Sequence, residues 1–365
     1  MKISEIISHL ETIAPPSLQE SYDNAGLITG KAEWNCKGLI VCLDSTPDVV
    51  REAIATDSNF IVAHHPIVFN GLKKINGSNY VEEAIILAIK NDIAIYAIHT
   101  NLDNVIGGVN KMMADKLNLI NRSVLSPKTG ILQKLHVFVP TEHAERVRNA
   151  VFTAGGGQIG KYSECSFSVE GLGSFKGDSD TDPFVGEPGS RHLEKETRLE
   201  VIFPSYLTNK IVAAMKSVHP YEEVAYDLVD LANQFGGAGS GIAGELPVPM
   251  PEMEFLHLLK SAFGLQVIRH SPLRGKQLSK VALCGGAGSF LISKALNAAA
   301  DVFITADMKY HEFFDANNRM IICDIGHFES EQFTADLLYA ILREKFTNFA
   351  VLKTKVKTNP VHYFI

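Results

Sequence analysis

The sequence predicts an α/β protein in which two similar lobes are interrupted by an inserted α+β domain. Two observations lead to this prediction. In the first and last thirds of the chain, apolar runs typical of buried strands alternate with segments of helical periodicity, which indicates βαβ units and a largely parallel sheet. The middle third has a different order of elements, and a glycine-rich stretch over residues 236–241 separates it from the last third.

The bulk composition narrows the class of protein. The chain has 365 residues, of which 46% are hydrophobic and 21% charged, as expected for a globular protein with more than one domain. No apolar run reaches the roughly 18 residues of a membrane helix, and no signal-peptide core follows Met1. A net charge of −7 offers no basic surface for nucleic acid. Five scattered cysteines without a C-x-x-C pair predict a reducing compartment, so we expect a cytoplasmic protein.

The first third begins with an amphipathic helix and continues in strand–helix order. Apolar residues recur at helical spacing from Ile3 to Ile13, and Pro47 suits the first turn of a helix capped by Thr46. We assign residues 1–126 to the first α/β lobe. Its expected elements are helix 3–13, strand 38–43, a helix from Pro47, strand 60–63, helix 79–91, strand 93–98 and helix 108–118.

The middle third, residues 127–236, reads as a self-contained insert. Its order, β-α-β-β-α-β, is that of a ferredoxin-like domain. We expect the glycine run that follows it to act as a hinge. The expected elements are strand 132–139, helix 142–152, strands 163–170 and 199–203, helix 209–218 and strand 224–229.

The last third, residues 237–365, returns to α/β alternation and forms the second lobe. In both lobes polar residues follow two of the strands, which suggests that the lobes face one another across a shared site. The expected elements are helix 252–263, strand 280–284, helix 289–299, strands 301–305 and 320–324, and helix 328–344.

Two adjacent histidines, His64 and His65, follow the strand 60–63 and precede Pro66. Neighbouring side chains of a regular strand point to opposite faces, but at a strand end that turns at proline both rings can reach one site. The alternative is that one ring caps a carbonyl while the other is solvated. Ligands collect beyond the carboxyl ends of strands in open α/β sheets, so this place suits a metal.

Asp103 follows the strand 93–98 in the same way. Its alternative role is a turn residue, or the N-cap of the helix that begins after Gly108. His99 lies nearer the strand, so we expect it to hydrogen-bond a ligand or the substrate and to be a candidate for proton transfer.

His327 and Glu331 are four residues apart at the start of the last expected helix, and their side chains therefore share one face. This is a common chelating arrangement, although a solvated pair would have the same spacing. Glu329 should point elsewhere.

Together the three imidazoles and two carboxylates indicate a metal site. Nitrogen and oxygen ligands without thiolate suit zinc, iron, manganese or nickel. Five ligands exceed what one catalytic zinc takes from a protein, but they fit two divalent ions about 3.5–4 Å apart with a bridging carboxylate. We therefore predict two ions per subunit, zinc first among the candidates.

Two further loops carry polar or glycine residues. The glycine-rich loop 285–289 joins a strand to a helix as a phosphate-cradling turn would, or serves only as a tight turn. Asp307, Lys309 and His311 follow the strand 301–305 and either form an ordinary polar loop or line the cleft. In the second case Asp307 and Lys309 would contact substrate, and His311 would be a catalytic candidate beside His99.

The chain resembles the GTP cyclohydrolase 1 type 2 homolog family, also described as dinuclear-metal-centre hexameric proteins. The resemblance implies metal ligands at His64, His65, Asp103, His327 and Glu331, two α/β lobes, and a toroidal homohexamer. The middle segment is similar to the CutA/PII-like insert of longer members. The matching stretches are Tyr22-Asp23-Asn24-Ala25-Gly26-Leu27, Ala63-His64-His65-Pro66, His99-Thr100-Asn101-Leu102-Asp103, Thr305-Ala306-Asp307-Met308-Lys309-Tyr310-His311 and Gly326-His327-Phe328-Glu329-Ser330-Glu331.

Two functions follow from these expectations. The first is a hydrolase of the GTP cyclohydrolase type, acting on a nucleotide-like or phosphorylated small molecule by metal-activated water. The second is a non-catalytic metal-binding regulator or adaptor that forms a ring and binds a partner through the insert, an interpretation that rests on fold analogy.

Overall fold

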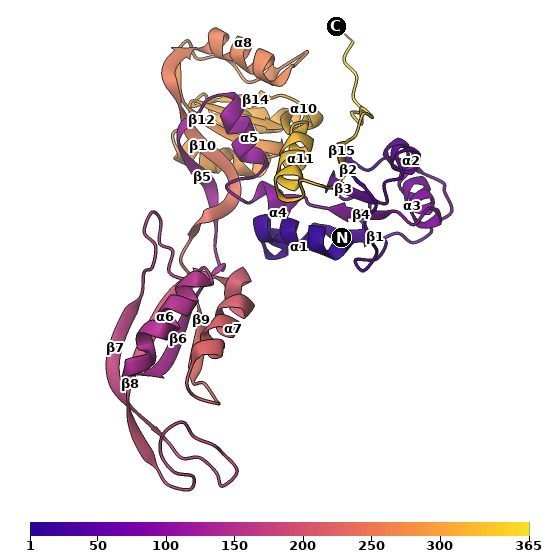
Figure 1. The fold of residues 1–365 in the computed structure, drawn as a ribbon. Helices are drawn as coiled ribbons and strands as arrows, with labels where there is room; N and C mark the ends of the chain where they lie inside the picture. The colour runs from indigo at the N-terminus through magenta and orange to yellow at the C-terminus, as the bar shows by residue number, and fades with distance from the viewer. Residues whose placement is uncertain (365) are drawn as a thin grey trace. The chain divides into compact units, whose positions relative to one another are not determined.

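The computed structural model describes residues 1–364 and shows two compact units (Figure 1). Unit 1 combines Met1–Pro127 with the described residues from Gly237 onward, and unit 2 is Lys128–Gly236. Residues 1–364 have a mixed α/β architecture with three sheets, two of them in unit 1 and one in unit 2. The mixed α/β class predicted from the sequence is therefore confirmed.

The first sheet of unit 1 has five strands in the order β1-β4-β3-β2-β15. The central strands β2, β3 and β4 are parallel, β1 is antiparallel to β4, and β15 is parallel to β2. The C-terminal part of the chain thus completes a sheet that the N-terminal part begins. The strands are β1 (Gly26–Thr29), β2 (Leu39–Asp44), β3 (Phe60–His65), β4 (Ala94–Ala97) and β15 (Val351–Lys353).

Helices cover both faces of this sheet because its central strands are apolar on both faces. Helices α1 and α11 lie on one side of the sheet and α2 and α3 on the other (Figure 1). In β2, Leu39 and Val41 pack with the first pair, whereas Ile40 and Cys42 pack with the second. This alternation follows from the two-residue period of a strand. The helices are α1 (Ile3–Ile13), α2 (Pro47–Ala55), α3 (Tyr80–Lys90) and α11 (Thr334–Lys345).

The second sheet of unit 1 has six strands in the order β11-β14-β13-β12-β10-β5. Strands β12, β13 and β14 are parallel, and β11 and β10 lie antiparallel to their neighbours β14 and β12. Helices α5 and α8 cover one face, and α9 with η5 covers the other. These elements are β5 (Ile120–Lys128), β10 (Phe235–Pro251), β11 (Arg269–His270), β12 (Gln277–Ala287), β13 (Val302–Ala306), β14 (Ile321–Asp324), α5 (Val109–Lys116), α8 (Glu252–Phe263), α9 (Ile292–Asn297) and η5 (Tyr310–Ala316).

The two sheets share a plan. In each, three parallel strands run in chain order and a short antiparallel strand flanks the third. The two halves also exchange helices, because α5 contributes Met113 to the second core while α11 contributes Leu338 and Leu342 to the first. The remaining short helices of unit 1 are η1 (Pro16–Leu18), α4 (Thr100–Asp103), η4 (Ser289–Leu291) and α10 (His327–Glu331).

Unit 2 has one antiparallel sheet in the order β7-β8-β6-β9, with its own core beneath α6 and α7. The chain order is β-α-β-β-α-β, as expected from the sequence. Inward residues such as Val137, Val201 and Met215 are fully buried or nearly so. Its elements are β6 (Leu132–Pro140), η2 (Thr141–His143), α6 (Ala144–Thr153), β7 (Phe167–Phe175), β8 (His192–Pro204), η3 (Ser205–Leu207), α7 (Thr208–Val218) and β9 (Tyr226–Asp230).

Two local predictions were wrong. The glycine run 236–241 is not a hinge but the start of β10. A Cβ on Gly239 would lie 2.2 Å from the Ser126 carbonyl oxygen, so glycine is needed there for close approach of two backbones. The expected helix 328–344 is broken into α10 and α11.

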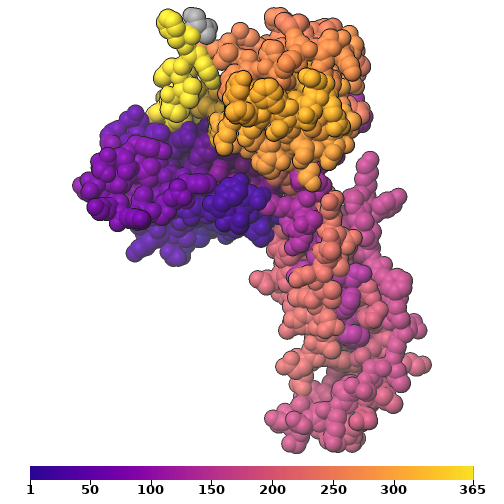
Figure 2. Space-filling view, turned by 180° about the vertical axis from the view of Figure 1, so that it is seen from behind, coloured from indigo at the N-terminus to yellow at the C-terminus, as the bar shows by residue number. Residues whose placement is uncertain are grey.

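The C-terminal segment after β15 lies on the surface of unit 1. Figure 2 shows it, in yellow, against both the purple N-terminal part and the orange C-terminal part of that unit. The Thr358 hydroxyl donates to Asp44, and the Asn359 amide donates to Glu329. Among residues 1–364, no helix is long and apolar enough to cross a membrane.

Candidate metal centre

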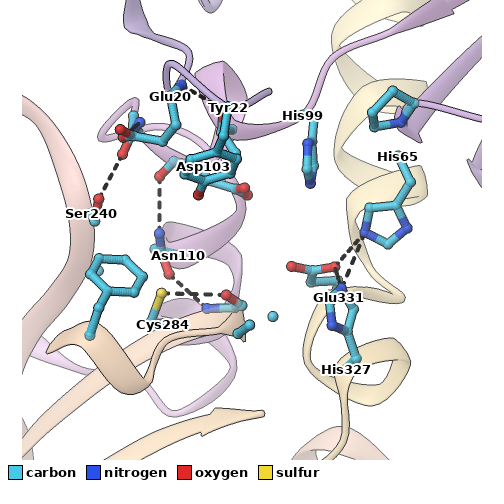
Figure 3. A pocket seen from close by; sticks show the side chains of 18 of the residues that line it. Glu20, Tyr22, His65, His99, Asp103, Asn110, Ser240, Cys284, His327 and Glu331 are labelled. Atoms are coloured by element: carbon cyan, nitrogen blue, oxygen red, sulfur yellow. Dashed lines mark hydrogen bonds and ion pairs between the residues drawn. The ribbon is translucent and has the colours of Figure 1, made fainter. Parts of the chain in front are cut away.

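Polar side chains from both sheets of unit 1 converge beyond the carboxyl ends of three parallel strands (Figure 3). His64 and His65 end β3, His99 and Asp103 follow β4, and the pair on α10 follows β14. These are the positions at which open α/β sheets bind ligands. The structure therefore brings the five expected metal ligands, and His99 with them, into one place.

His64 is the most deeply placed of these residues, with no exposed side-chain surface. Its Nδ1 lies 2.8 Å from the carbonyl oxygen of Ile98. A carbonyl only accepts, so Nδ1 carries the proton and Nε2 presents its lone pair to the cluster. Burial lowers the pKa of His64 to about 3, so the ring is neutral, as a metal ligand must be.

His65 projects from the same strand end but binds carboxylates on both sides. Its Nδ1 lies 2.7 Å from Asp44, and its Nε2 lies 2.9 Å from Glu331. Burial lowers the pKa of His65, but the hydrogen bonds to Asp44 and Glu331 outweigh burial and raise the pKa to about 9. The surroundings of His65 thus favour positive charge.

His327 begins α10 and approaches from the second sheet. Its Nδ1 lies 2.6 Å from Asp307, and its Nε2 lies 3.1 Å from Glu331 one helical turn later. Burial lowers its pKa, yet these two carboxylates raise it to about 11. The expected sharing of one helix face by His327 and Glu331 is thus observed, and Glu329 points away to accept from Asn359.

His99, like His65 and His327, has an aspartate beside its Nδ1. Its Nδ1 lies 2.7 Å from Asp23, which also accepts from the Thr100 hydroxyl and amide. Burial raises the pKa of Asp23, but the bonds from His99 and Thr100 lower it to about 2, so the carboxylate is charged. The His99 ring lies 5.3 Å from that of His64, centroid to centroid.

In all four histidines Nδ1 is bound by an oxygen outside the cluster. The outer oxygens come from Ile98, Asp44, Asp23 and Asp307. Such partners fix the orientation of a histidine ligand and leave Nε2 for the metal. A hydrogen-bond partner on the ring nitrogen that faces away from the metal is typical of metal sites.

Glu331 is the centre of the cluster, and its side chain is 4% exposed. Burial raises its pKa, but hydrogen bonds from His327 and His65 lower it well below the ordinary value. The pKa of Asp103 is raised, by burial first and by the charge of Glu331 second. These two carboxylates have donor atoms within 4.8 Å of one another, and two negative charges at that distance favour a cation between them.

The donor atoms form groups of three that suit a metal ion. Within each group all donor atoms lie within 4.8 Å of one another. The groups are His65-His327-Glu331, His64-Asp103-Glu331 and His64-His65-His99. Glu331 belongs to two of these groups, and His99, which sequence reasoning placed outside the ligand set, belongs to the third.

Two buried atoms support the fit to a metal. His64 Nε2 and Asp103 Oδ1 lie 3.6 Å apart, and within residues 1–364 neither has a hydrogen-bond partner. An unpaired buried polar atom is costly, so such atoms usually have an unseen partner. The Nε2 atoms of His65 and His327 are 3.4 Å apart, close to the roughly 3.3 Å between two nitrogens of a tetrahedral zinc site.

The glycine-rich loop after β12 gives Glu331 room to enter. A Cβ on Gly286 would lie 2.5 Å from Glu331 Oε1, and the φ of Gly286 is +60°. The amide of Gly285 donates to Asn110, and that of Gly286 donates to Ser330. These two amides are bonded within the protein, as in a tight turn that admits Glu331, and a ligand contact by the rest of the loop stays a prediction.

The cluster forms one wall of a cavity of about 410 Å³. Three aromatic side chains, Tyr22, Phe69 and Phe290, lie on other parts of its lining and are largely exposed. The residues that line it in the described chain include neither lysine nor arginine. Positive charge for an anionic substrate would therefore have to come from bound metal or from histidine.

The three candidate residues after β13, Asp307, Lys309 and His311, lie outside the described cavity lining. Asp307 binds His327, so it contacts the cluster and not the cavity. Lys309 and His311 are outside the described cavity lining, and the Lys309 amide donates to Glu312 at the start of η5. The sequence analysis gave no role to Asp44 or Asp23. Asp44 could have been found, because it lies at the end of a buried strand, as the position that pointed to Asp103 does.

The protein-family model for Duf34/NIF3 (NGG1p interacting factor 3) matches residues 1–360. A curated protein of Halalkalibacterium halodurans named GTP cyclohydrolase 1 type 2 homolog is 39% identical, over 99% of each chain. A protein of Bacillus subtilis with the same name is 36% identical, over 98% of this chain and 97% of its own.

Solved structures agree with these matches. A Bacillus cereus protein related to NIF3 superposes with a TM-score of 0.87 and 37% identity, covering 100% of this chain and 99% of its own. The Staphylococcus aureus protein SA1388 gives a TM-score of 0.77 at 27% identity, with the same coverage.

Proposed function

The chain belongs to the Duf34/NIF3 family, and from this premise we propose that it is a dinuclear-metal-dependent hydrolase. The ligands of the proposed site are His64, His65, Asp103, His327 and Glu331. They would hold two divalent ions per subunit, with zinc first and iron, manganese or nickel as the other candidates, because the donors are imidazoles and carboxylates.

One observation carries this proposal. Glu331 belongs to two groups of potential ligands, one with His65 and His327 and one with His64 and Asp103. A carboxylate shared in this way is the arrangement that holds two ions at bridging distance. A single tetrahedral ion would leave part of the set unused.

The surrounding residues support hydrolysis. Divalent ions in such a site supply positive charge and a strong nucleophile at neutral pH. His99, held by Asp23 and lining the cavity, is placed to accept or donate a proton through Nε2. Tyr22, Phe69 and Phe290 offer flat apolar surface to a planar ring.

We propose a small substrate with a planar ring, of which a nucleotide is the type suggested by the name of the relatives. The cavity volume of about 410 Å³ fits a molecule of that size. The lining has no lysine or arginine to hold a phosphate, which favours a base or nucleoside portion against the aromatic rings, with any phosphate next to the metal site.

A turnover screen tests the proposal. Metal-loaded protein would be incubated with GTP, with other nucleotides and nucleosides, and with simple phosphoesters, and products would be identified by mass spectrometry. We expect a product that is absent with Glu331→Gln, which loses the shared carboxylate, and present with Glu329→Gln, its matched control. Equal rates for the two variants would contradict metal-dependent hydrolysis at this site.

A regulatory or adaptor role is the second candidate. It is favoured by unit 2, a ferredoxin-like insert by our interpretation, which has its own core and contains none of the proposed ligands. We also propose a toroidal homohexamer and a cytoplasmic location. The family resemblance suggests the ring, and all five cysteines being free suggests the compartment.

A further inference from the structure

Unit 2 contains a second cavity, of about 300 Å³, whose lining combines aromatic rings with carboxylates. It lies between the end of β7, the polar loop 176–191, β8 and the turn before β9. The proposed metal chemistry uses none of it. The side chains that matter are Phe175, Phe184, Tyr221, Glu196 and Glu222.

The turn His219-Pro220-Tyr221 is held in one conformation. His219 is buried, its Nε2 donates to the carbonyl of Phe138, and its Nδ1 accepts from the amide of Tyr221. Burial lowers the pKa of His219, which keeps the ring neutral and able to accept at Nδ1. The position of Tyr221 is therefore fixed by its own turn.

Tyr221 in turn orients a carboxylate. Its hydroxyl donates to Glu196 Oε1 at 2.9 Å. Burial raises the pKa of Tyr221, and the bond to Glu196 raises it further, so the phenol stays protonated and donates to this carboxylate. Gly173 leaves space for this carboxylate, because a Cβ there would lie 2.1 Å from Glu196 Oε2.

Two further rings complete the aromatic part. The ring of Tyr221 lies 5.9 Å from that of Phe175 and 6.3 Å from that of Phe184, centroid to centroid. Phe184 comes from the loop 176–191, which is tied to the turn by the Asp182 amide donating to Glu222 at 3.3 Å. Three rings from three segments thus surround one space.

The charge of the cavity is negative. Its described lining carries the carboxylates of Glu196, Glu222 and Glu223 against the single ammonium of Lys176, a formal charge of −2. Aromatic faces attract cations through their quadrupole, and grouped rings recognise alkylated ammonium ions. A carboxylate beside the rings adds direct charge complementarity.

We propose that this cavity binds a small organic cation of the alkylated-ammonium class. The rings of Phe175, Phe184 and Tyr221 would surround the cationic head, and Glu196 would provide the counter-charge. The size of the cavity, near the lower end for ligand pockets, limits the ligand to a small metabolite or the end of a cationic side chain. Unit 2 would then be a ligand-sensing domain.

Isothermal titration calorimetry on the full chain tests this proposal, with choline as the probe and 3,3-dimethylbutan-1-ol as its neutral isostere. We expect choline to bind about ten-fold more tightly than the isostere, as a cation–π contribution of about 1.4 kcal/mol requires. Equal affinity for the two compounds, or no binding of choline at about 10 mM, which corresponds to only about 2.7 kcal/mol of binding free energy, would overturn the proposal.

Variants locate the binding. Phe184→Ala removes a ring that is 52% exposed, so it should weaken choline binding at least about five-fold without loss of fold. Glu196→Gln should weaken it similarly while keeping the Tyr221 hydrogen bond. Phe167→Ala, an exposed ring of β7 outside the cavity lining, is the control. Unchanged affinity in folded Phe184→Ala and Glu196→Gln would place binding elsewhere and refute the site.

Discussion

The two sheets of unit 1 have the same plan, but they contribute to the polar cluster in different ways. The first sheet supplies His64, which has no exposed side-chain surface and is tied to the backbone of Ile98. The second supplies His327, whose side chain is 39% exposed and is held by Asp307 on a loop. The His64 ring is therefore enclosed by the fold, whereas the His327 ring lies partly at the surface.

This difference in burial implies that some ligands contribute to both fold stability and metal binding, and others mainly to metal binding. A buried ligand contributes to the stability of the fold as well as to metal binding, because its ring fills space in the core. A ligand on a short helix at the surface contributes mainly to metal binding. Glu331 joins the two halves, since it comes from the second sheet and contacts His65 of the first.

The largest effect should follow from Glu331→Gln, which removes the charge of the carboxylate shared by two groups of potential ligands. Metal added to wild type should raise the unfolding midpoint, since ligand at 100 times its dissociation constant stabilises by about 2.7 kcal/mol. We expect this rise to vanish in Glu331→Gln and to persist in Glu329→Gln, whose carboxylate contacts Asn359. A full rise in Glu331→Gln would show that the halves bind metal without their shared residue.

Replacing the most buried and the most exposed histidine of the cluster should separate effects on stability from effects on metal affinity. His64→Ala leaves a cavity and a buried carbonyl without its donor, and should cost roughly 2–4 kcal/mol in the free energy of unfolding. His327→Ala should cost less than about 1 kcal/mol, as for a surface position, while still weakening metal binding. Urea unfolding of both variants measures these free energies. Equal losses of stability would refute the different roles assigned to His64 and His327.

Smaller effects should come from the carboxylates that orient the rings. Asp44→Asn and Asp307→Asn should each lower metal affinity by about 10-fold or more, with the fold intact. We expect the larger loss for Asp44→Asn, because Asp44 is 32% exposed and Asp307 52%. Competition with a chelator measures the affinities, and Asp57→Asn, at an 86% exposed carboxylate, is the control. Wild-type affinity in both variants would mean that the rings need no outer partner.

Deletion of unit 2 should have the smallest effect on metal. Residues 128–236 have a separate core and include none of the proposed ligands. The chain leaves and re-enters unit 1 at neighbouring strands β5 and β10, so a short linker can join them. Metal content per chain should equal that of wild type. Loss of metal in a folded deletion variant would show that the insert supports the site.

The order of elements was predictable because each has a strong local pattern. The run Phe60–His65 is apolar until its last two residues, and α1 has apolar residues at every helical turn. Strands β1, β5, β10, β11 and β15 were not expected. Val351–Lys353 forms a strand because β2 offers an open edge, which is tertiary information that three residues cannot carry.

The residues of the site could be predicted from the sequence, but the hydrogen bonds that hold them could not. Strand ends and the four-residue spacing pointed to His64, Asp103 and Glu331, and these side chains do lie together. The aspartate partners could not be assigned, because Asp23 and His99 are 76 residues apart and meet only through the fold. The positions of α5 and α11 could not be predicted for a similar reason. The apolar face of a helix does not show in the sequence which of the two cores it will join.

The number of metal ions per chain tests the central claim most directly. Wild-type protein saturated with zinc and freed of excess metal would be measured by elemental mass spectrometry against protein concentration. The account predicts two ions per chain, and fewer with Glu331→Gln. One ion per chain in the wild type, unchanged by Glu331→Gln, would contradict a dinuclear site shared between the two sheets.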